Sequence, residues 1–260
     1  MFREMFPIAW AFHRNTSIPP YRLGGPGGLF PKEPVPPFKE YSTAELVPLP
    51  SPGELKTSLG AAIQERLSCR QFEDHPLPLT TLATLLHASY GIQDQVLLDE
   101  HEVLSRPVPS GGGLYPLEVY VLVRKVQGLD PGIYHYAVID HTLERLDLAP
   151  VPAPRLTELF LGQSYPEDAA LVVVITAVLG RSLKKYADRG YRLVLLEAGH
   201  LVQNLNLVAT ALGWGSVNLG GFLDDELGAV LDLDREVEVP VYATAVGKPR
   251  GTSADVLRQA

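Results

Sequence analysis

Two short basic segments carry the residues best suited to bind an anion. Arg66, Ser68 and Arg70 lie two positions apart, so an extended backbone directs all three side chains to one side. Near the other end of the sequence, Lys248 and Arg250 repeat this spacing after an apolar run. Guanidinium groups bind phosphate through paired hydrogen bonds. Both segments are therefore candidates for a phosphate site, and a solvated loop or strand exit is the alternative for each.

Two glycine-containing segments could bring backbone amides close to a flat ligand. Ser110 is followed by three glycines just before a predicted strand, and Gly220–Gly221 follow a second apolar run. Glycine permits positive φ and close approach of the backbone, although a flexible loop is the alternative. The first segment precedes a strand, whereas a dinucleotide fingerprint follows one. Tyr242 stands where a phosphate loop ending in Lys248 needs a glycine, so ATP chemistry is not expected.

Two further candidates have simpler explanations. Glu197 and His200 have the spacing of a di-iron helix motif, but the other ligands are not evident, so we expect a buried structural pair. Cys69, the single cysteine, lies between two arginines without an identifiable His or Asn partner. We therefore expect a buried, unreactive thiol and no metal site. A single cysteine also fits a reducing compartment, which favours the cytoplasm.

The elements that position these residues can be predicted from hydrophobic periodicity. Apolar residues at helical spacing predict two amphipathic helices and one long core helix, at 54–67, 79–90 and 191–212. Short β-branched runs predict central strands at 118–124, 171–177 and 240–247, and a hairpin over 132–138 and 142–148. A further helix follows Gly221, with Asp224 as its predicted cap. The order lacks regular strand–helix alternation, so the predicted class is α+β.

Proline marks a separate N-terminal segment. Ten of the 23 prolines fall between Pro19 and Pro52, where they disfavour helix interiors and central strands. We predict an extended arm over residues 1–52 and one domain over residues 53–260. Aromatic residues within the arm favour a segment laid over a surface, and a disordered leader is the alternative.

The composition excludes several classes of function. The formal net charge of −8 argues against nucleic-acid binding, which depends on clustered lysine and arginine. The long apolar helix contains Glu197, His200 and Asn204, so it is too polar to span a bilayer. With 46% hydrophobic residues in 260, the chain can bury a full core. We expect a soluble, cytoplasmic protein.

Taken in order, these segments resemble the nitroreductase family of flavoenzymes, and within it the SagB-type branch of thiazoline and oxazoline dehydrogenases. The matching text is RLSCRQF, PLPLTTLATLLHASYGI, RPVPSGGGLYPLEVYVLV, GIYHYAV, KKYADRGYRLVLLEAGHLVQNLNLVATALGWG, LGGF and VGKPR. The resemblance covers about residues 66–250. Each motif is weak alone, and their shared order makes the match specific.

The resemblance implies a nitroreductase-like fold, with a mainly antiparallel sheet flanked by helices, and a homodimer with FMN at each of two interface sites. Arg66 and Ser68 would hold the phosphate and ribityl chain, and Arg70 would lie near the pyrimidine edge. The remaining implied site residues are a second phosphate clamp (Lys248, Arg250), backbone near flavin N5 (Gly220, Gly221), a partner-subunit loop (Pro109, Ser110, Gly111) and the branch's Lys-Tyr pair (Lys185, Tyr186).

The activity implied is dehydrogenation of a small or peptidic azoline-like heterocycle, with hydride passing to flavin N5. A cation such as Arg70 would stabilise the negative charge of a reduced flavin. Lys185 or Tyr186 would accept the proton that leaves with the hydride. The first alternative is an NAD(P)H-dependent nitro- or quinone-reductase. The second is a flavin-binding scaffold subunit of a peptide-modifying complex, without turnover of its own.

Overall fold

A single antiparallel sheet forms the centre of the molecule. The computed structural model describes residues 2–17, 35–98 and 101–251. The strands follow the order β1 (Glu45–Pro48), β7 (Thr142–Arg145), β6 (Gly132–Ala137), β5 (Leu117–Val123), β8 (Leu171–Val178), β10 (Glu238–Pro249) and β2 (Phe72–Glu73), while β9 (Gly215–Leu219) pairs with β10. The ladders between these strands are antiparallel. The predicted α+β class and antiparallel sheet are confirmed.

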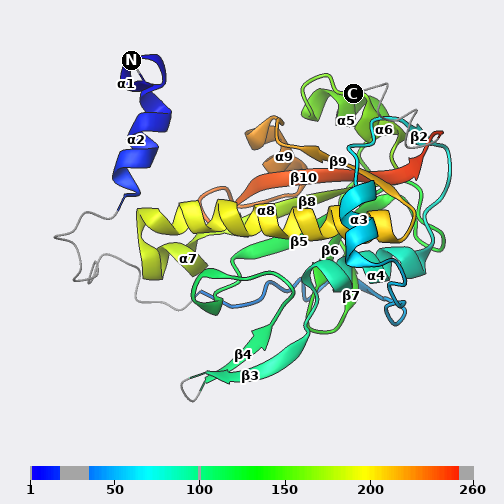
Figure 1. Cartoon of the computed structure of the whole chain (residues 1–260), viewed down its shortest axis with the longest axis horizontal. Helices are drawn as coiled ribbons and strands as arrows, with labels where there is room; N and C mark the ends of the chain where they lie inside the picture. The colour runs from blue at the N-terminus through cyan, green and yellow to red at the C-terminus, as the bar shows by residue number, and fades with distance from the viewer. Residues whose placement is uncertain (1, 18–34, 99–100, 252–260) are drawn as a thin grey trace.

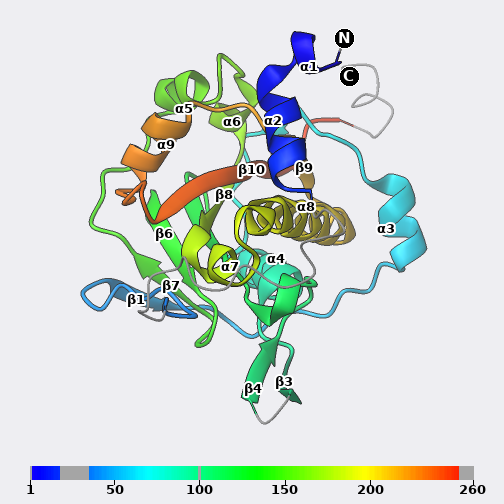
Figure 2. The ribbon, with the colours of Figure 1, turned by 90° about the vertical axis from the view of Figure 1, so that its left-hand side faces the viewer.

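Helices cover both faces of the sheet. One face packs against α4 (Leu79–Tyr90) and α8 (Asp188–Ala211), and the other against α5 (Ala153–Leu159), α6 (Tyr165–Asp168) and α9 (Asp224–Val230). Figure 2 shows the sheet between these two groups. Successive β8 residues alternate between the two cores: Leu171 and Val173 join the first, while Val172 and Val174 join the second. Burial on both faces explains why this strand is uniformly apolar.

The long helix α8 crosses the molecule from end to end (Figure 1). It begins at Asp188, three residues before the predicted start, and a short helix, α7 (Leu179–Tyr186), precedes it. Ala187 separates the two helices with φ of 49°. A positive φ breaks the helical ladder, so α7 and α8 pack as a hairpin rather than continuing as one rod.

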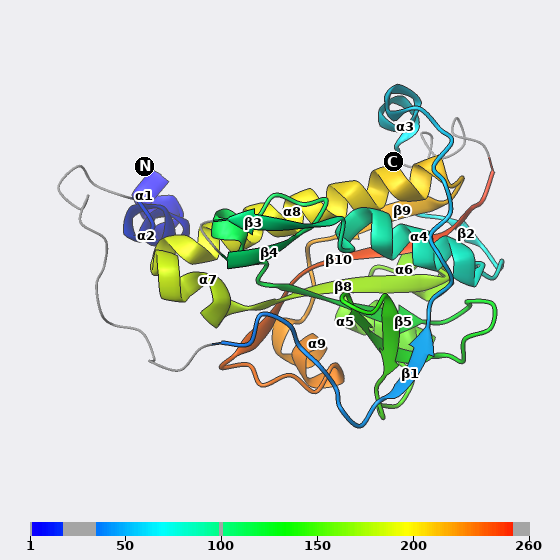
Figure 3. The same cartoon turned by 90° about the horizontal axis from the view of Figure 1, so that it is seen from below.

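Three predicted features need correction or were missed. The helix expected over 54–67 spans only α3 (Leu59–Glu65), because Ser58 caps it with a 3.2 Å bond from Ala61 N. Asp224 does not cap α9: Leu223 is the N-cap, and Asp224 is the first helical residue. The hairpin of β3 (Asp94–Leu98) and β4 (His101–Ser105) was not predicted; it forms a separate sheet that projects from the domain (Figure 1) and lies in front of α8 when seen from below (Figure 3).

The N-terminal segment differs in part from the expected extended arm. Residues 2–15 form α1 (Phe2–Met5) and α2 (Pro7–Asn15). The prolines cluster after residue 17, and Pro7 occupies the first turn of α2, where its missing N–H costs nothing. The central part of the arm, residues 18–34, lies outside the described residues. Within the described ranges, no helix is long and apolar enough to cross a membrane.

Candidate functional site

The two basic segments meet at one corner of the sheet. Ser68 forms a parallel bridge with Ser216 of β9, and Cys69 N donates to Ser216 O at 2.9 Å. Two residues later, Arg250 N donates to Gln71 O at 3.0 Å. The structure therefore brings together the segments containing Arg66 and Arg250, as a shared phosphate site requires.

Arg66 has an extended backbone and Ser68 lies in a bridge, which is the condition for Arg66, Ser68 and Arg70 to share one side. Cys69 is buried and packs against Gly215, where an added Cβ would lie 2.9 Å from Cys69 Sγ. Alternation directs Ser68 and Arg70 away from that core. The expected burial of Cys69 is confirmed, and burial raises the pKa of its thiol, which disfavours the reactive thiolate.

Lys248 and Trp214 close this corner on the side of α8. Lys248 Nζ donates to Gly213 O at 3.2 Å and lies 5.7 Å from the centre of the Trp214 ring. A cavity of about 190 Å³ lies beside them, between the end of α8, residues 65–69 and the end of β10. The corner thus combines cationic side chains with an accessible recess.

A glycine pair lies at the other end of β9. From Ser216 at the basic corner, the chain follows β9 to Gly220, the residue after the strand, which is about 13 Å away at the usual rise per residue. Between them, Asn218 Oδ1 is buried without a hydrogen-bond partner among the described residues. Gly220 is exposed, and a Cβ on Gly221 would press against Leu161 at 3.0 Å. The unpaired Asn218 Oδ1 and the exposed backbone of Gly220 therefore follow the basic corner along β9.

The loop after Pro109 forms a second cluster with the Lys-Tyr pair. Gly112 has φ of 70°, and a Cβ there would lie 2.6 Å from Tyr186 Oη and 2.8 Å from Lys185 Nζ. Gly111 packs against Tyr186 and Leu193, while Lys185 is exposed. The positive φ of Gly112 disfavours other residues, and the loop lies against Lys185 and Tyr186, a contact that the sequence alone did not indicate.

Glu197 supports this loop from α8. It is buried, and Ser110 Oγ donates to its Oε2 at 2.6 Å. His200, in contrast, is exposed, so the expectation of a buried Glu–His pair holds only for Glu197. The two side chains lie three positions apart, about 60° around the axis of α8, so Glu197 meets the loop while His200 lies toward solvent.

The two clusters lie at opposite ends of the fold. Leu117, just after the loop, is level with Ala177 and Val239 across three strands. Lys248 lies nine residues further along β10 than Val239, which corresponds to about 30 Å. Figure 1 shows this separation, with α7 at one end and β2 at the other. Within one chain, the loop and the basic corner cannot enclose the same small ligand.

A third region, missed from the sequence, is a buried ionic network beneath residues 38–44. His135 Nδ1 lies 2.6 Å from Glu144 Oε2, and its Nε2 lies 3.1 Å from Glu118 Oε2. Arg181 Nη2 lies 2.6 Å from Glu118 Oε1, and Lys39 Nζ donates to Glu238 at 2.6 Å. The sequence signal was only one ionisable member of this network in each of four strands, namely Glu118, His135, Glu144 and Glu238.

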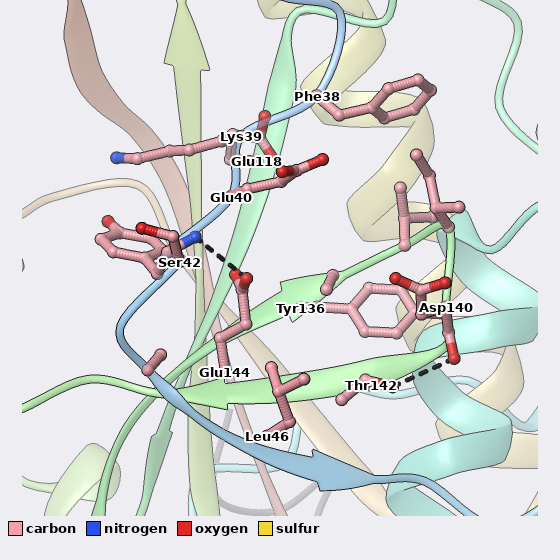
Figure 4. Close-up of a pocket in the computed structure, with 15 residues that line it drawn as sticks. Phe38, Lys39, Glu40, Ser42, Leu46, Glu118, Tyr136, Asp140, Thr142 and Glu144 are labelled. Carbon is pink, nitrogen blue, oxygen red and sulfur yellow. Dashed lines mark hydrogen bonds between the residues drawn. The ribbon is translucent and has the colours of Figure 1, made fainter.

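The network borders a cavity of about 340 Å³ between residues 38–44 and the β6–β7 hairpin (Figure 4). Glu118 and Glu144 face this cavity, and Tyr41 N donates to Glu144 Oε1 at 3.0 Å. None of the predicted site residues lines it. Its buried carboxylates are already paired, so the network serves to join strands and the covering segment.

Hydrogen bonding determines the ionisation of this network. Burial opposes a charge on His135, but its bonds to Glu118 and Glu144 outweigh burial and raise the pKa of His135. The same bonds, with Arg181 beside Glu118, hold the pKa of both carboxyls below their ordinary value despite burial. These contacts therefore favour the cationic form of His135 between two carboxylates.

Comparison with known proteins agrees with this architecture. The Nitroreductase family profile matches residues 63–248, a range that contains both clusters except for Arg250. The chain belongs to the nitroreductase family. Membership of this family supports an oxidoreductase activity.

Three relatives illustrate the range of similarity. The chain is 36% identical over 202 residues to MJ1384 of Methanocaldococcus jannaschii, described as a nitroreductase, covering 78% of this chain and 96% of that one. A nitroreductase structure from Anabaena variabilis has a TM-score of 0.75 and 30% identity, covering 92% of this chain and 46% of that one. The microcin B17-processing protein McbC of Escherichia coli is 30% identical over 151 residues, covering 55% of this chain and 54% of McbC.

Proposed function

We propose that this nitroreductase-family protein is an FMN-dependent dehydrogenase of the SagB type, which oxidises an azoline-like heterocycle. The observation that carries the proposal is the contact of Lys185 and Tyr186 with Gly112, which presents an amine and a phenol beside the loop expected to meet the flavin. Similarity to McbC, a microcin-processing protein, supports a peptide-derived substrate.

The residues along β9 fit a flavin mononucleotide. Arg66, Ser68, Lys248 and Arg250 would hold the phosphate and ribityl chain through charge-assisted hydrogen bonds. Asn218 Oδ1, buried without a partner among the described residues, would accept from the ligand. An unsatisfied buried acceptor is costly, so a ligand donor at this position is favourable. When bound, FMN supplies the group that accepts a hydride.

A complete site needs a second copy of the chain. The Ser110–Gly113 loop is about 30 Å from the basic corner along the sheet in one chain. Both can contact one flavin only if the loop comes from the partner. The proposal therefore includes a homodimer, in which each subunit contributes its basic corner to one site and its loop to the other.

Exposed apolar residues provide a surface for this dimer. Leu196 on α8 is 54% exposed, and Ile63 on α3 is 58% exposed. Leu59 and Leu195 extend the same apolar character along the two helices, and α3 lies across α8 in Figure 1. The apolar stripe that predicts an amphipathic α3 thus remains uncovered in a single chain. Packing against a second copy would bury it.

Lys185 and Tyr186 would handle the proton of the reaction. Oxidation of an azoline to an azole removes a hydride and a proton from the ring. Either side chain could accept that proton when it lies within hydrogen-bond reach of the substrate. Their contact with Gly111 and Gly112 restricts where their polar atoms can lie, and such restriction favours catalysis over a freely solvated amine.

The test begins with the ligand released on denaturation of the purified protein, which should be FMN. Anaerobic addition of a synthetic azoline peptide should bleach the bound flavin, whereas NADH or NADPH should not. Bleaching by a nicotinamide alone would favour a nitro- or quinone-reductase. Protein that stays colourless after reconstitution with FMN would refute the flavin assignment.

A further inference from the structure

Glu197 is a buried carboxylate at the base of the Ser110–Gly113 loop, and it is 3% exposed. Ser110 Oγ donates to Oε2 at 2.6 Å, and Tyr90 Oη, whose single proton is shared with Leu117 O at 3.2 Å, lies 3.4 Å from Oε1. A buried carboxylate depends on such donors because it has lost its hydration. Of these two bonds, the one from the loop hydroxyl is much the shorter.

The Ser110 hydroxyl has few hydrogen-bonding options left. A hydroxyl has one proton to donate and two lone pairs that accept. Its proton is directed to Glu197, and one lone pair accepts from Tyr115 N at 2.9 Å. While Glu197 is ionised, Ser110 can therefore offer a ligand only an acceptor.

Protonation of Glu197 would reverse this polarity. The carboxylic O–H would then donate to Ser110 Oγ, and the Ser110 proton would be free to donate elsewhere. Tyr115 N keeps its bond in both states, so the loop need not refold. The exchange moves one proton onto Glu197 and changes Ser110 from an acceptor to a donor.

We propose that Glu197 is a positioning residue whose ionisation sets whether Ser110 presents an acceptor or a donor to the flavin of the partner subunit. This inference rests on the proposed function for the identity of the ligand, but the hydrogen-bond exchange involves only Glu197, Ser110 and Tyr115 of this chain. Gly111 and Gly112 pack against Tyr186 and Lys185, so the polarity of Ser110 is set beside the residues expected to handle the substrate.

The surroundings of Glu197 make both states accessible near neutral pH. Burial raises the pKa of Glu197 to about 7, against the opposing effects of the Ser110 bond, the Arg106 charge and the Tyr90 bond. Arg106 is itself buried and lies 4.4 Å from the centre of the Tyr90 ring. Beyond Tyr90, Glu118 is neutralised by Arg181 and His135.

The first test follows the Tyr115 amide, which bonds directly to Ser110. In protein labelled with ¹⁵N-tyrosine, the Tyr115 resonance is identified by its absence in Tyr115→Phe. We expect it to titrate with a midpoint near pH 7 in the FMN-free protein and to lose that titration in Glu197→Gln. Glu236→Gln, an exposed control, should titrate as the original protein does. Ser110→Ala, which keeps the backbone, should also lose the Tyr115 titration. It replaces Glu197→Gln in this test if that variant fails to fold.

The second test measures the FMN dissociation constant from pH 5.5 to 8.5. Exchange of one hydrogen-bond polarity should change it by about tenfold across this range, and by less than twofold in Glu197→Gln. A Tyr115 titration that persists in Glu197→Gln, or its absence in the original protein, would overturn the inference. Failure to bind FMN with a normal Tyr115 titration would refute the proposed function instead.

Discussion

Replacing His135 with Gln removes the only cation that lies directly between two buried carboxylates in the described network. His135 is 1% exposed and contacts Glu144 at 2.6 Å and Glu118 at 3.1 Å. Arg181 still neutralises Glu118 in the variant, but Glu144 keeps only the Tyr41 N–H and the weaker amide donor of Gln. One buried negative charge is left uncompensated.

The expected loss of stability follows from this one uncompensated buried charge. Removing one partner of a buried ion pair typically destabilises a protein by about 3–5 kcal/mol. For a chain of this length, that corresponds to a melting temperature lower by roughly 6–20 °C. His13→Gln makes the same chemical change on an exposed side chain of α2, so it should cost less than about 0.5 kcal/mol.

The pH dependence gives an independent signature. The pKa of His135 is raised on folding, so its contribution is complete below the ordinary value of 6.5 and is lost as the pH rises through the folded value. The lowered pKa of Glu118 and Glu144 makes their contribution complete above 4.5 and lost at lower pH. The network should therefore stabilise most between about pH 4.5 and 6.5.

Urea unfolding of matched samples, with the flavin content held equal, measures both effects, because bound ligand adds stability of its own. Above pH 6.5 the unfolding free energy of the original protein should fall by up to about 1.4 kcal/mol per pH unit from this histidine. His135→Gln should lack this component. A variant within 1 kcal/mol of the original, with an unchanged pH slope, would refute a cationic His135.

Three further predictions concern the proposed site. Arg66→Ala and Arg250→Ala should each raise the FMN dissociation constant by roughly 10–150-fold, the loss of one charge-assisted bond; equal flavin fluorescence titrations in both variants would contradict the phosphate assignment. Lys185→Ala and Tyr186→Phe should retain FMN but slow azoline oxidation by roughly 10²–10⁴-fold; full single-turnover rates in both would exclude them as the base. Leu196→Glu should yield monomers by light scattering, because it places an unpaired charge in the proposed interface; an intact dimer would place the interface elsewhere.

The sequence was most informative where local signals and burial agree. The helix over 79–90 has the predicted ends, because its apolar face is continuous and Gly91 follows it. The strand predicted at 118–124 is shifted by one residue from the observed strand, and the strand predicted at 171–177 ends one residue early. In contrast, α7 was not predicted, although its apolar residues Leu179 and Leu183 lie four positions apart. It buries Arg181 and Ser182, and Glu118 of β5 stabilises the arginine charge, a tertiary contact that local periodicity does not contain.

The same distinction applies to the site. Spacing indicated that Arg66, Ser68 and Arg70 share one side if their segment is extended, and the Ser68 bridge meets that condition. The contact of Gly112 with Lys185 and Tyr186 joins residues more than 70 positions apart, so only the family resemblance placed them near one flavin. The hydrogen bond between Ser110 and Glu197 was missed because a lone helical Glu is usually structural.

Composition marked the N-terminal residues as an arm, yet part of that segment completes the core. Lys39 supplies the cation for buried Glu238, which also accepts from Tyr120 at 3.0 Å and from Thr176 at 2.5 Å. Counted together, Lys39, His135 and Arg181 balance Glu118, Glu144 and Glu238. Without Lys39 the network would carry a buried net negative charge, which is strongly unfavourable. Prolines exclude a segment from regular helices and central strands, but they do not prevent its side chains from neutralising charge in the core.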